Sequence, residues 1–436
     1  MRYHILTYGC QMNVHDSETL AGILENTGYE PTGRPEEADF ILLNTCAVRQ
    51  TAEERILGRL GELKRFKYER PGIIIGVCGC VPQQKGAAER IMQRAPHVDL
   101  IFGTHNLHRL PELLARAGKG QRVIEVVEGA GRAEGLPMRR QGGHAAWVNI
   151  TYGCDNFCSY CIVPYVRGRE RSRPPEAVLE EVQQLAREGY LEITLLGQNV
   201  NSYGRDLRGS VTFAGLLRQL DAIPGLERLR YMTSHPRDFT DELIEVIAGS
   251  SKVCEHFHLP LQAGSDRILR AMNRGYTQEH YLGLIEKIRR AVPGASLTTD
   301  IIVGFPGETE EDFLETMRVV DQLRYDAAFT FMYSPRGGTP AAARPDQIAA
   351  EVKKERLARL MRRQNEISRE INKHLVGTRA EVLVEGESAT DPAMYTGRTR
   401  TNKPVLFPAC PDLSGSLQSI RITEARTFTL YGVVHD

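Results

Sequence analysis

Short apolar runs alternate with amphipathic stretches along the first third of the chain. The runs DFILLN (39–44) and GIIIGVC (72–78) are apolar at nearly every position, which is typical of strands buried on both faces of a parallel sheet. Between them, residues 48–66 place their charges on one side of a helical repeat. We therefore expect a parallel sheet covered by helices on both faces. The pattern predicts further strands at 3–9, 98–103 and 122–126 and further helices at 16–26 and 83–94.

The same alternation continues through the middle of the chain. A run of strand–helix units in one sheet folds with right-handed crossovers, so this region predicts a full or partial (β/α) barrel. In such a barrel, function lies at the carboxyl ends of the strands. The strand candidates are 146–151, 192–198, 228–234, 256–262, 297–305 and 327–334.

The last part of the chain changes character. Residues 351–375 form one net-basic helical stretch, and the short strands after it are separated by Gly, Pro and Asp. These strands predict a small antiparallel β-barrel of the OB-like kind. The predicted α/β chain is divided into an N-terminal domain (1–128), a Gly- and Arg-rich linker (129–143), a central domain with its basic helix (144–372) and the small barrel (373–436).

The composition limits the classes of function. The 436 residues include 55 Lys and Arg and 55 Asp and Glu, so any basic surface for nucleic acid must be local. The apolar runs are too short to cross a membrane and the start lacks an apolar signal segment, so we expect a cytoplasmic protein. The nine cysteines are unevenly spaced, and clustered thiols in a cytosolic chain more often bind metal than form disulfides.

Three cysteines fall on one short segment directly after the first strand of the central domain. Cys154, Cys158 and Cys161 follow a C-x3-C-x2-C spacing, and we call them the loop thiol set. Structural zinc usually takes four ligands in two pairs, so a zinc site would need a distant fourth ligand. Three thiolates can instead hold three irons of a [4Fe–4S] cluster and leave the fourth iron open to a small chelating molecule. The spacing favours the cluster.

A second group of cysteines is spread over the first domain. Cys10, Cys46 and Cys80 each follow a predicted strand, and we call them the N-terminal thiol set. The carboxyl edge of a parallel sheet would bring them together. The residues alone leave two alternatives open, a second site with an open iron or three buried core cysteines. They also do not choose between Cys80 and its neighbour Cys78.

The segment GCDNFCSYCIVPYVRGRERSR (153–173) resembles the cluster loop of radical S-adenosylmethionine enzymes, in the version found in methylthiotransferases. TYGCQMN, NTCAVRQ, HLPLQAGS and TTDIIVGFPGETEEDF match the same family, and residues 373–436 resemble its TRAM module, an OB-like RNA-binding barrel. The resemblance implies two [4Fe–4S] clusters, with Cys80 rather than Cys78 as a ligand of the second. It also implies that S-adenosylmethionine chelates the open iron and is cleaved to a 5′-deoxyadenosyl radical.

Polar residues near the strand ends are candidates for contacts to that cofactor. They are Gln198, Ser234, Gln262 and Asp300. Hydrogen bonding within the loops is the alternative for any one of them.

A local basic strip follows the loop thiol set. Arg167, Arg169 and Arg171 alternate along the chain, so an extended segment would place them on one side, where they suit a phosphate-rich substrate. The alternative is an ordinary charged loop.

The segment GRTRTNKPVLFP of the small barrel supplies a second candidate surface for RNA. Its cations Arg398, Arg400 and Lys403 suit phosphate contact, and Phe407 suits base stacking.

The resemblance also implies a substrate. It indicates transfer of a methylthio group to carbon 2 of N(6)-isopentenyladenosine next to the anticodon, in the anticodon stem-loop of tRNA. The implied partners are a flavodoxin- or ferredoxin-like reducing protein and a sulfur source, without a membrane, and we expect a monomer.

Other functions stand as alternatives. Related enzymes methylthiolate threonylcarbamoyl-adenosine in tRNA or an aspartate of a ribosomal protein. Outside this class are an iron–sulfur RNA-binding or electron-transfer protein without radical chemistry, and a zinc-bearing RNA chaperone, which would be colourless.

Overall fold

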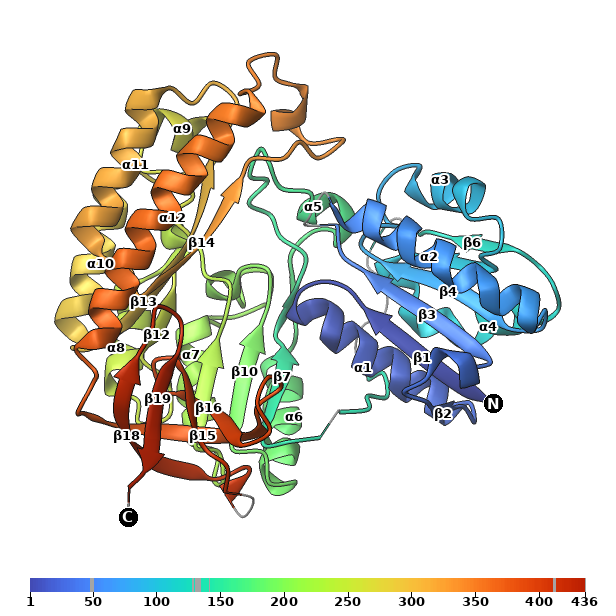
Figure 1. Cartoon of the computed structure of the whole chain (residues 1–436), viewed down its shortest axis with the longest axis horizontal. Helices are drawn as coiled ribbons and strands as arrows, with labels where there is room; N and C mark the ends of the chain where they lie inside the picture. Colours follow the sequence, from blue (N-terminus) through green and yellow to red (C-terminus); the bar gives the residue numbers. More distant parts are fainter. Residues whose placement is uncertain (48–50, 128, 130–134, 141, 411–412, 436) are drawn as a thin grey trace.

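The N-terminal domain is built on a parallel sheet, as the apolar runs predict (Figure 1). The computed structural model describes residues 1–47, 51–127, 129, 135–140, 142–410 and 413–435. Every residue of β3 is buried, because this strand lies inside the sheet between β1 and β4. The strands are β1 (Arg2–Thr7), β2 (Glu30–Pro31), β3 (Phe40–Thr45), β4 (Ile74–Gly79), β5 (Leu100–Phe102) and β6 (Val123–Glu125). Their order across the sheet is β2-β1-β3-β4-β5-β6.

Helices cover both faces of this sheet. Leu20 and Leu113 pack in one core layer, and Ile56 and Ile91 pack in the other. The helix predicted at 16–26 already begins at Gln11, and α4 was not predicted. The predicted helix start at 48–50 lies outside the described residues. The helices are α1 (Gln11–Asn26), α2 (Thr51–Glu69), α3 (Ala87–Arg94) and α4 (Leu110–Gly118).

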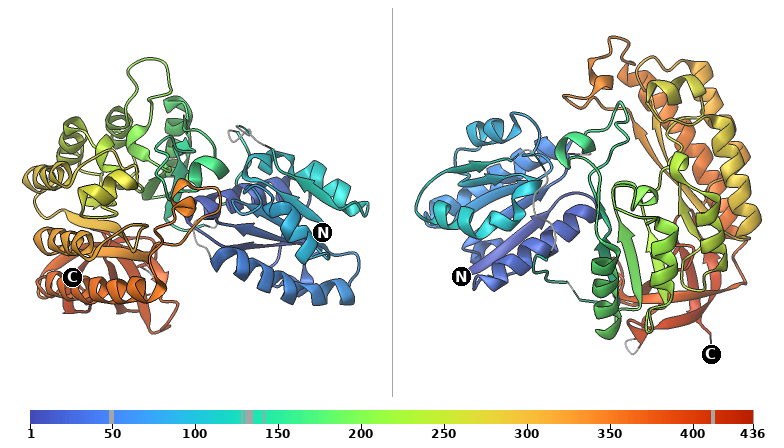
Figure 2. Two further views of the ribbon diagram at one scale, coloured as in Figure 1. Left: turned by 90° about the horizontal axis from the view of Figure 1, so that it is seen from above. Right: turned by 180° about the vertical axis from the view of Figure 1, so that it is seen from behind.

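The central domain is a partial barrel, and all six predicted strands are present. They form two parallel three-stranded sheets, β11-β10-β7 and β12-β13-β14, which are joined by a bridge between Leu229 and Val253. Helices lie on the outside of the curved sheet (Figure 2). The strands are β7 (Ala145–Asn149), β10 (Glu192–Leu196), β11 (Arg228–Tyr231), β12 (His256–His258), β13 (Ser296–Val303) and β14 (Ala327–Met332).

The outer helices alternate with these strands, as the strand–helix pattern of the sequence predicts. They are α6 (Pro175–Arg187), α7 (Phe213–Asp221), α8 (Asp241–Gly249), α9 (Asp266–Ala271), α10 (Gln278–Ala291) and α11 (Glu310–Leu323). Between β7 and α6 lie β8 (Thr151–Tyr152), the short helix α5 (Val163–Val166) and β9 (Arg171–Ser172). Short 3-10 helices occupy Pro35–Glu37, Thr104–Arg109, Val200–Ser202, Pro236–Asp238 and Pro340–Ala343.

The predicted basic helix is α12 (Ala350–Lys373), which packs along β14. Its inner face is fixed by buried polar groups as well as apolar ones. Arg356 Nη1 donates to Glu308 Oε2 at 2.8 Å, and Gln364 Nε2 donates to the backbone oxygen of Tyr325 at 2.7 Å. Among the helices within the described ranges, none is long and apolar enough to cross a membrane.

The C-terminal residues close into the predicted small barrel, in which every strand pair but one is antiparallel and residues 405–406 pair in parallel with 430–431. Val382, Phe407 and Ile420 fill its core. Figure 1 shows this barrel beside the amino ends of the central strands. There, Arg228 at the start of β11 is fully buried and donates through Nη2 to Glu381 Oε1 at 2.8 Å. The strands are β15 (Arg379–Glu387), β16 (Met394–Thr399), β17 (Pro404–Pro408), β18 (Leu417–Ala425) and β19 (Leu430–Val434). Their order around the barrel is β15-β16-β17-β19-β18.

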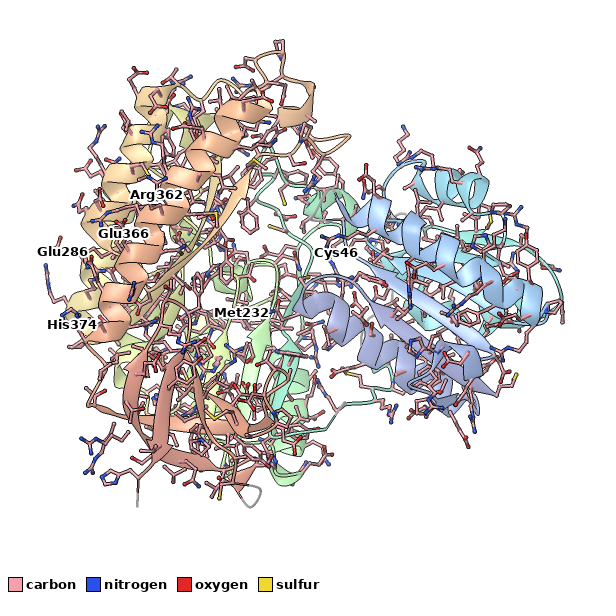
Figure 3. The ribbon with its side chains drawn as sticks, viewed as in Figure 1. Cys46, Met232, Glu286, Arg362, Glu366 and His374 are labelled. Atoms are coloured by element: carbon pink, nitrogen blue, oxygen red, sulfur yellow. The ribbon has the colours of Figure 1, made fainter. Side chains whose placement is uncertain are left out.

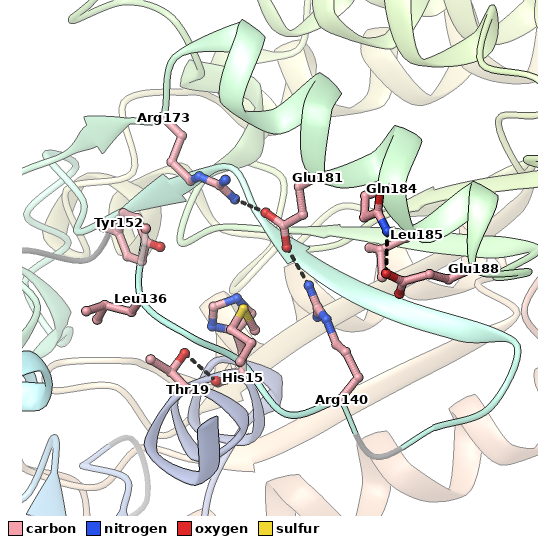
Figure 4. Close-up of a pocket in the computed structure, with 12 residues that line it drawn as sticks. His15, Thr19, Leu136, Arg140, Tyr152, Arg173, Glu181, Gln184, Leu185 and Glu188 are labelled. Carbon is pink, nitrogen blue, oxygen red and sulfur yellow. Dashed lines mark hydrogen bonds and ion pairs between the residues drawn. The ribbon is translucent and has the colours of Figure 1, made fainter. Parts of the chain in front are cut away.

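Part of the predicted linker joins the first two domains through an ion-pair network. Arg140 pairs with Glu18 of α1 at 3.3 Å and also with Glu181 of α6, which in turn pairs with Arg173 at 2.6 Å. Arg140, Arg173 and Glu181 border a cavity of about 330 Å³ between α1, the linker and α6 (Figure 4). Linker residues 130–134 and 141 lie outside the described residues.

Candidate metal and cofactor site

The N-terminal thiol set converges at one edge of the N-terminal sheet. Cys10 follows β1 and is the N-cap of α1, while Cys46 and Cys80 come directly after β3 and β4. These strands are parallel neighbours, so their carboxyl ends meet. A Cβ on Gly9 would lie 2.6 Å from the Cβ of Cys46, which places the loop of Cys10 against Cys46. Figure 3 shows Cys46 on the side of the domain that faces the central domain.

Two buried asparagines hold this edge together. Asn13 Nδ2 donates to Asn44 Oδ1 and to the backbone oxygen of Thr45, both at 3.2 Å. Asn44 Nδ2 donates in return to the backbone oxygen of Asn13 at 2.8 Å. Because both side chains are fully buried, these bonds satisfy polar groups that would otherwise be costly. Their positions beside the cysteines, in CQMN and NTC, are the sequence signal that could have identified them.

The electrostatic environment distinguishes the N-terminal cysteines. A hydrogen bond with Cys46 lowers the pKa of Cys10 to about 6, assisted by the charge of Arg167 and opposed by burial. Burial raises the pKa of Cys80, although Arg167 acts in the opposite direction. Cys78 packs in the opposite core layer, where burial raises its pKa well above the usual value. The geometry therefore supports Cys80 rather than Cys78 as the third member of the set.

The loop thiol set lies on a segment that is fixed by the last residue of α9 and the residues directly after it. Ser159 N donates to the backbone oxygen of Met272 at 3.0 Å, and Ser159 Oγ donates to that of Ala271 at 2.8 Å. Asn273 Nδ2 donates to the backbone oxygen of Phe157 at 3.0 Å. Phe157 and Asn273 have positive φ angles of 44° and 58°, and such strain concentrates at functional sites. The loop is thus held in one conformation by the distal part of its domain.

A buried guanidinium faces the middle cysteine of the loop thiol set. Arg274 Nη1 donates to Cys158 Sγ at 3.3 Å, and Arg274 Nε donates to Tyr276 Oη at 3.2 Å. Burial raises the pKa of Cys154 and that of Cys161 to about 12. Arg274 supplies positive charge that favours ionised sulfur at this site. It was not predicted, because 116 residues separate it from Cys158.

The donor chemistry of both sets fits an iron–sulfur cluster. Each set offers three sulfur donors and places a guanidinium beside them. Three thiolates without a fourth match a [4Fe–4S] cluster with an open iron better than a tetrahedral zinc. Within the described ranges, no group of three or more His, Cys, Asp and Glu side chains is arranged to hold a single metal ion.

Buried polar atoms collect at the carboxyl ends of the central strands. They follow β7, β10, β11 and β12 in turn, at the end of the barrel where the loop thiol set follows β8. A buried polar group that lacks a partner costs about 1–3 kcal/mol, so this ring fits a polar ligand such as S-adenosylmethionine. The buried atoms without a hydrogen-bond partner in the described part of the chain include Thr151 Oγ1, Asn199 Oδ1, Ser234 Oγ, His235 Nε2 and Gln262 Oε1.

Two of the four predicted cofactor contacts belong to this ring, Ser234 and Gln262, and Gln262 has a φ of 67°. Gln198 is half-buried just after β10. Asp300 lies inside β13 rather than at its end, and its Oδ2 is 3.6 Å from His258 Nε2. Contact of all four with the cofactor stays a prediction.

Two of the four barrel residues predicted to contact RNA, Arg400 and Lys403, form ion pairs with the central domain. Arg400 Nη2 pairs with Glu255 at 2.7 Å, and Lys403 Nζ pairs with Asp326 at 2.5 Å. Phe407 is fully buried in the barrel core, so it has no face on which to stack a base. The prediction that Phe407 stacks a base is therefore wrong, whereas RNA contact by Arg400 and Lys403 stays a prediction.

The arginines of the basic strip after the loop thiol set differ in exposure. Arg167 turns inward, and its Nη2 donates to Asp16 Oδ2 of the N-terminal domain at 2.7 Å. Its side chain is only 8% exposed, so it does not belong to a surface for RNA. Arg169 is 75% exposed and Arg398 is 43% exposed, while Arg171 is partly buried. These three also remain predicted RNA contacts.

Three family models match the chain. The radical SAM superfamily matches residues 148–320, the TRAM domain matches residues 373–435, and an uncharacterized protein family, UPF0004, matches residues 2–103. These matches cover the central domain, the small barrel and the sheet that carries the N-terminal thiol set, respectively.

Similar proteins extend over the whole chain. The tRNA-2-methylthio-N(6)-dimethylallyladenosine synthase of Carboxydothermus hydrogenoformans is 57% identical over 434 residues, which cover 99% of each chain. The enzyme of the same name from Moorella thermoacetica is 55% identical over 436 residues, covering 100% of this chain and 98% of the relative.

Solved structures share the fold. The radical S-adenosylmethionine methyltransferase TsrM from Kitasatospora setae, with cobalamin and a [4Fe-4S] cluster bound, superimposes with a TM-score of 0.57 at 15% identity, covering 90% of this chain and 78% of that chain. The cobalamin-dependent radical enzyme OxsB gives a TM-score of 0.54 at 14% identity, covering 84% and 56%.

Proposed function

The chain belongs to the family of tRNA-2-methylthio-N(6)-dimethylallyladenosine synthases, and from this premise we propose how its residues divide the work of adding a methylthio group to carbon 2 of N(6)-isopentenyladenosine in tRNA. The observation that carries the proposal is the presence of two three-thiol sets on facing domains, each beside a buried guanidinium. One cluster with an open iron suits radical formation, and a second suits the supply of sulfur.

The loop thiol set would hold the cluster that, with S-adenosylmethionine bound, supplies a 5′-deoxyadenosyl radical for removal of the hydrogen from carbon 2. Arg274 would stabilise the ionised sulfur of Cys158 through its hydrogen bond. Ser234 and Gln262 offer buried polar atoms that would orient the cofactor. The N-terminal thiol set would hold the second cluster.

The barrel walls would exclude water from the reacting atoms. The N-terminal domain lies against the carboxyl ends of the central strands through α5, so a base bound there would be enclosed between the two thiol sets. A base in a single-stranded anticodon loop can be extruded into such a site without breaking a pair. This enclosure would hold the base against one reactive carbon.

The exposed cations suit the phosphates around that base. Arg169 and Arg398 are exposed, each in a surface ion pair, with Asp155 and Glu385 respectively. Along the chain, Arg169 and then Arg171 follow the loop thiol set. We further infer a monomer that receives electrons from a flavodoxin- or ferredoxin-like protein and sulfur from a separate source, in the cytoplasm where tRNA is modified.

The test is direct. The protein is reconstituted without oxygen with iron and sulfide, then incubated with S-adenosylmethionine, a reductant and tRNA that bears isopentenyladenosine without the methylthio group. Mass spectrometry of the digested nucleosides should show the gain of one methylthio group, and Cys158→Ala should abolish it. Release of 5′-deoxyadenosine without that gain would point to another substrate. Absence of both, with both clusters assembled, would contradict the enzyme assignment.

A further inference from the structure

The segment that leaves the loop thiol set enters the N-terminal domain. Directly after Cys161, Ile162 and Val166 pack in the core layer that also contains Cys80, Ala47 and their neighbours. This contact is reinforced at its end, where Thr104 Oγ1 donates to the backbone oxygen of Val166 at 2.8 Å. Helix α5 is therefore anchored at one end by the loop thiol set and at the other by the edge that carries the N-terminal thiol set.

The next residue, Arg167, reaches that second set. Its guanidinium pairs with Asp16 at 2.7 Å, and the two side chains are 8% and 7% exposed. The same guanidinium interacts electrostatically with Cys10 and Cys80. A charge contributed by the central domain thus lies inside the thiol site of the N-terminal domain.

The burial of Arg167 requires negative charge around it. Moving an ion out of water costs several kcal/mol unless opposite charges and hydrogen bonds compensate. Asp16 supplies one negative charge, and thiolates that hold a cluster would supply more. The next arginine, Arg169, is 75% exposed and faces solvent, so burial is particular to Arg167 rather than general to the segment.

We propose that Arg167 is a positioning residue shared by the two thiol sets, which ties the loop thiol set to the N-terminal thiol set and raises the reduction potential of a [4Fe–4S] cluster held there. The inference rests on the proposed function, which places a cluster on the N-terminal thiol set. Positive charge near a cluster stabilises its reduced form, which carries one more negative charge. Asp16 has the opposite effect on that potential, and the ion pair fixes the position of both charges.

The experiment uses the full chain with the loop thiol set replaced by alanine, so that a cluster on the N-terminal thiol set is observed by itself. In this background, the parent is compared with Arg167→Gln, Arg167→Lys and Asp16→Asn, and Arg169→Gln is the matched control. After anaerobic reconstitution, iron content is determined and the midpoint potential is measured by titration monitored by electron paramagnetic resonance.

We expect a lower potential for Arg167→Gln, a higher one for Asp16→Asn, a value near the parent for Arg167→Lys and no shift for Arg169→Gln. The opposite signs identify the charge itself, since loss of a merely structural ion pair would shift both variants in the same direction. An unchanged potential in Arg167→Gln at equal iron content would overturn the inference. The titration uses neither tRNA nor S-adenosylmethionine, so failure to methylthiolate tRNA would count against the proposed function alone.

Discussion

Arg274 and Cys158 are joined by a hydrogen bond of 3.3 Å from a buried guanidinium nitrogen to the sulfur. Arg274 also contacts Tyr276 and the backbone oxygen of Pro260, so its position is fixed from three sides. The segment after α9 therefore determines the electrostatic environment of a loop that lies far away in the sequence.

Replacing Arg274 by glutamine should weaken the site at Cys158. Loss of a hydrogen bond to a ligating group typically costs about 10- to 100-fold in metal affinity or activity. We expect release of 5′-deoxyadenosine to fall by at least about tenfold, measured by chromatography in reconstituted protein. Arg270→Gln, an exposed arginine four residues earlier, is the control. Equal cleavage rates in the two variants would contradict a role for the guanidinium.

The two cysteines of the CGC segment should behave differently. Cys80→Ala should remove the iron of one cluster, because Cys80 lies with the N-terminal thiol set. Cys78→Ala should retain that iron and lose about 1 kcal/mol or more of stability, since Cys78 packs in the opposite core layer. Iron analysis after reconstitution distinguishes them. Retention of all iron in Cys80→Ala would reject Cys80 as a ligand.

Arg228 should hold the small barrel in place. It is fully buried, and it donates to Glu381 Oε1 at 2.8 Å and to the backbone oxygen of Arg398 at 2.8 Å. Glu381 is 49% exposed, so the loss is smaller than for a fully buried pair. Since a hydrogen bond to a charged group contributes about 1.5–3 kcal/mol, Arg228→Met should lower the thermal midpoint and speed tryptic cleavage near residue 376. Arg421→Met, at an exposed position of β18, should leave both unchanged. Tryptic cleavage of Arg228→Met and Arg421→Met at equal rates would show that other contacts are enough to hold the small barrel in place.

The stability of the central domain should depend on Asp312 in a defined pH range. Burial would raise its pKa, but hydrogen bonds from Arg267, Ser265 and Thr309 outweigh burial and lower the pKa to about 2. A carboxyl group with a depressed pKa stabilises the fold above its unfolded value near 4 and loses this contribution as the pH falls toward 2.

Asp312→Asn should therefore destabilise the protein by about 2 kcal/mol at pH 7, and the difference should narrow progressively below pH 4. Thermal midpoints of the two proteins, recorded from pH 7 down to pH 3, provide the measurement. Glu311→Gln, an exposed residue in the same helical turn, serves as the control. A difference that is constant with pH would mean that the carboxylate charge contributes nothing.

The buried strands and the placement of the cysteines after them could be predicted, because both depend on patterns that are local in the sequence. Apolar runs at 39–44 and 72–78 fix buried parallel strands, and cysteines placed just after such strands must meet at one edge. The loop thiol set depends even less on the tertiary structure, since three cysteines within one short segment must lie near one another in any fold. Both thiol sets could therefore be predicted from the sequence, although the choice of Cys80 over Cys78 came from the family resemblance.

The role of individual charges could not be predicted in the same way. A sequence reveals that Arg167, Arg400 and Lys403 are cations, but not whether water or a carboxylate surrounds them. Only the tertiary structure pairs Arg167 with Asp16, 151 residues away, and Arg400 with Glu255, 145 residues away. Burial removes water, and the electrostatic energy of a charge then depends on its nearest partners in space. Secondary structure and thiol spacing were thus determined by residues close in the sequence. Whether each arginine is paired or exposed was decided by residues that are distant in the sequence but close in the folded structure.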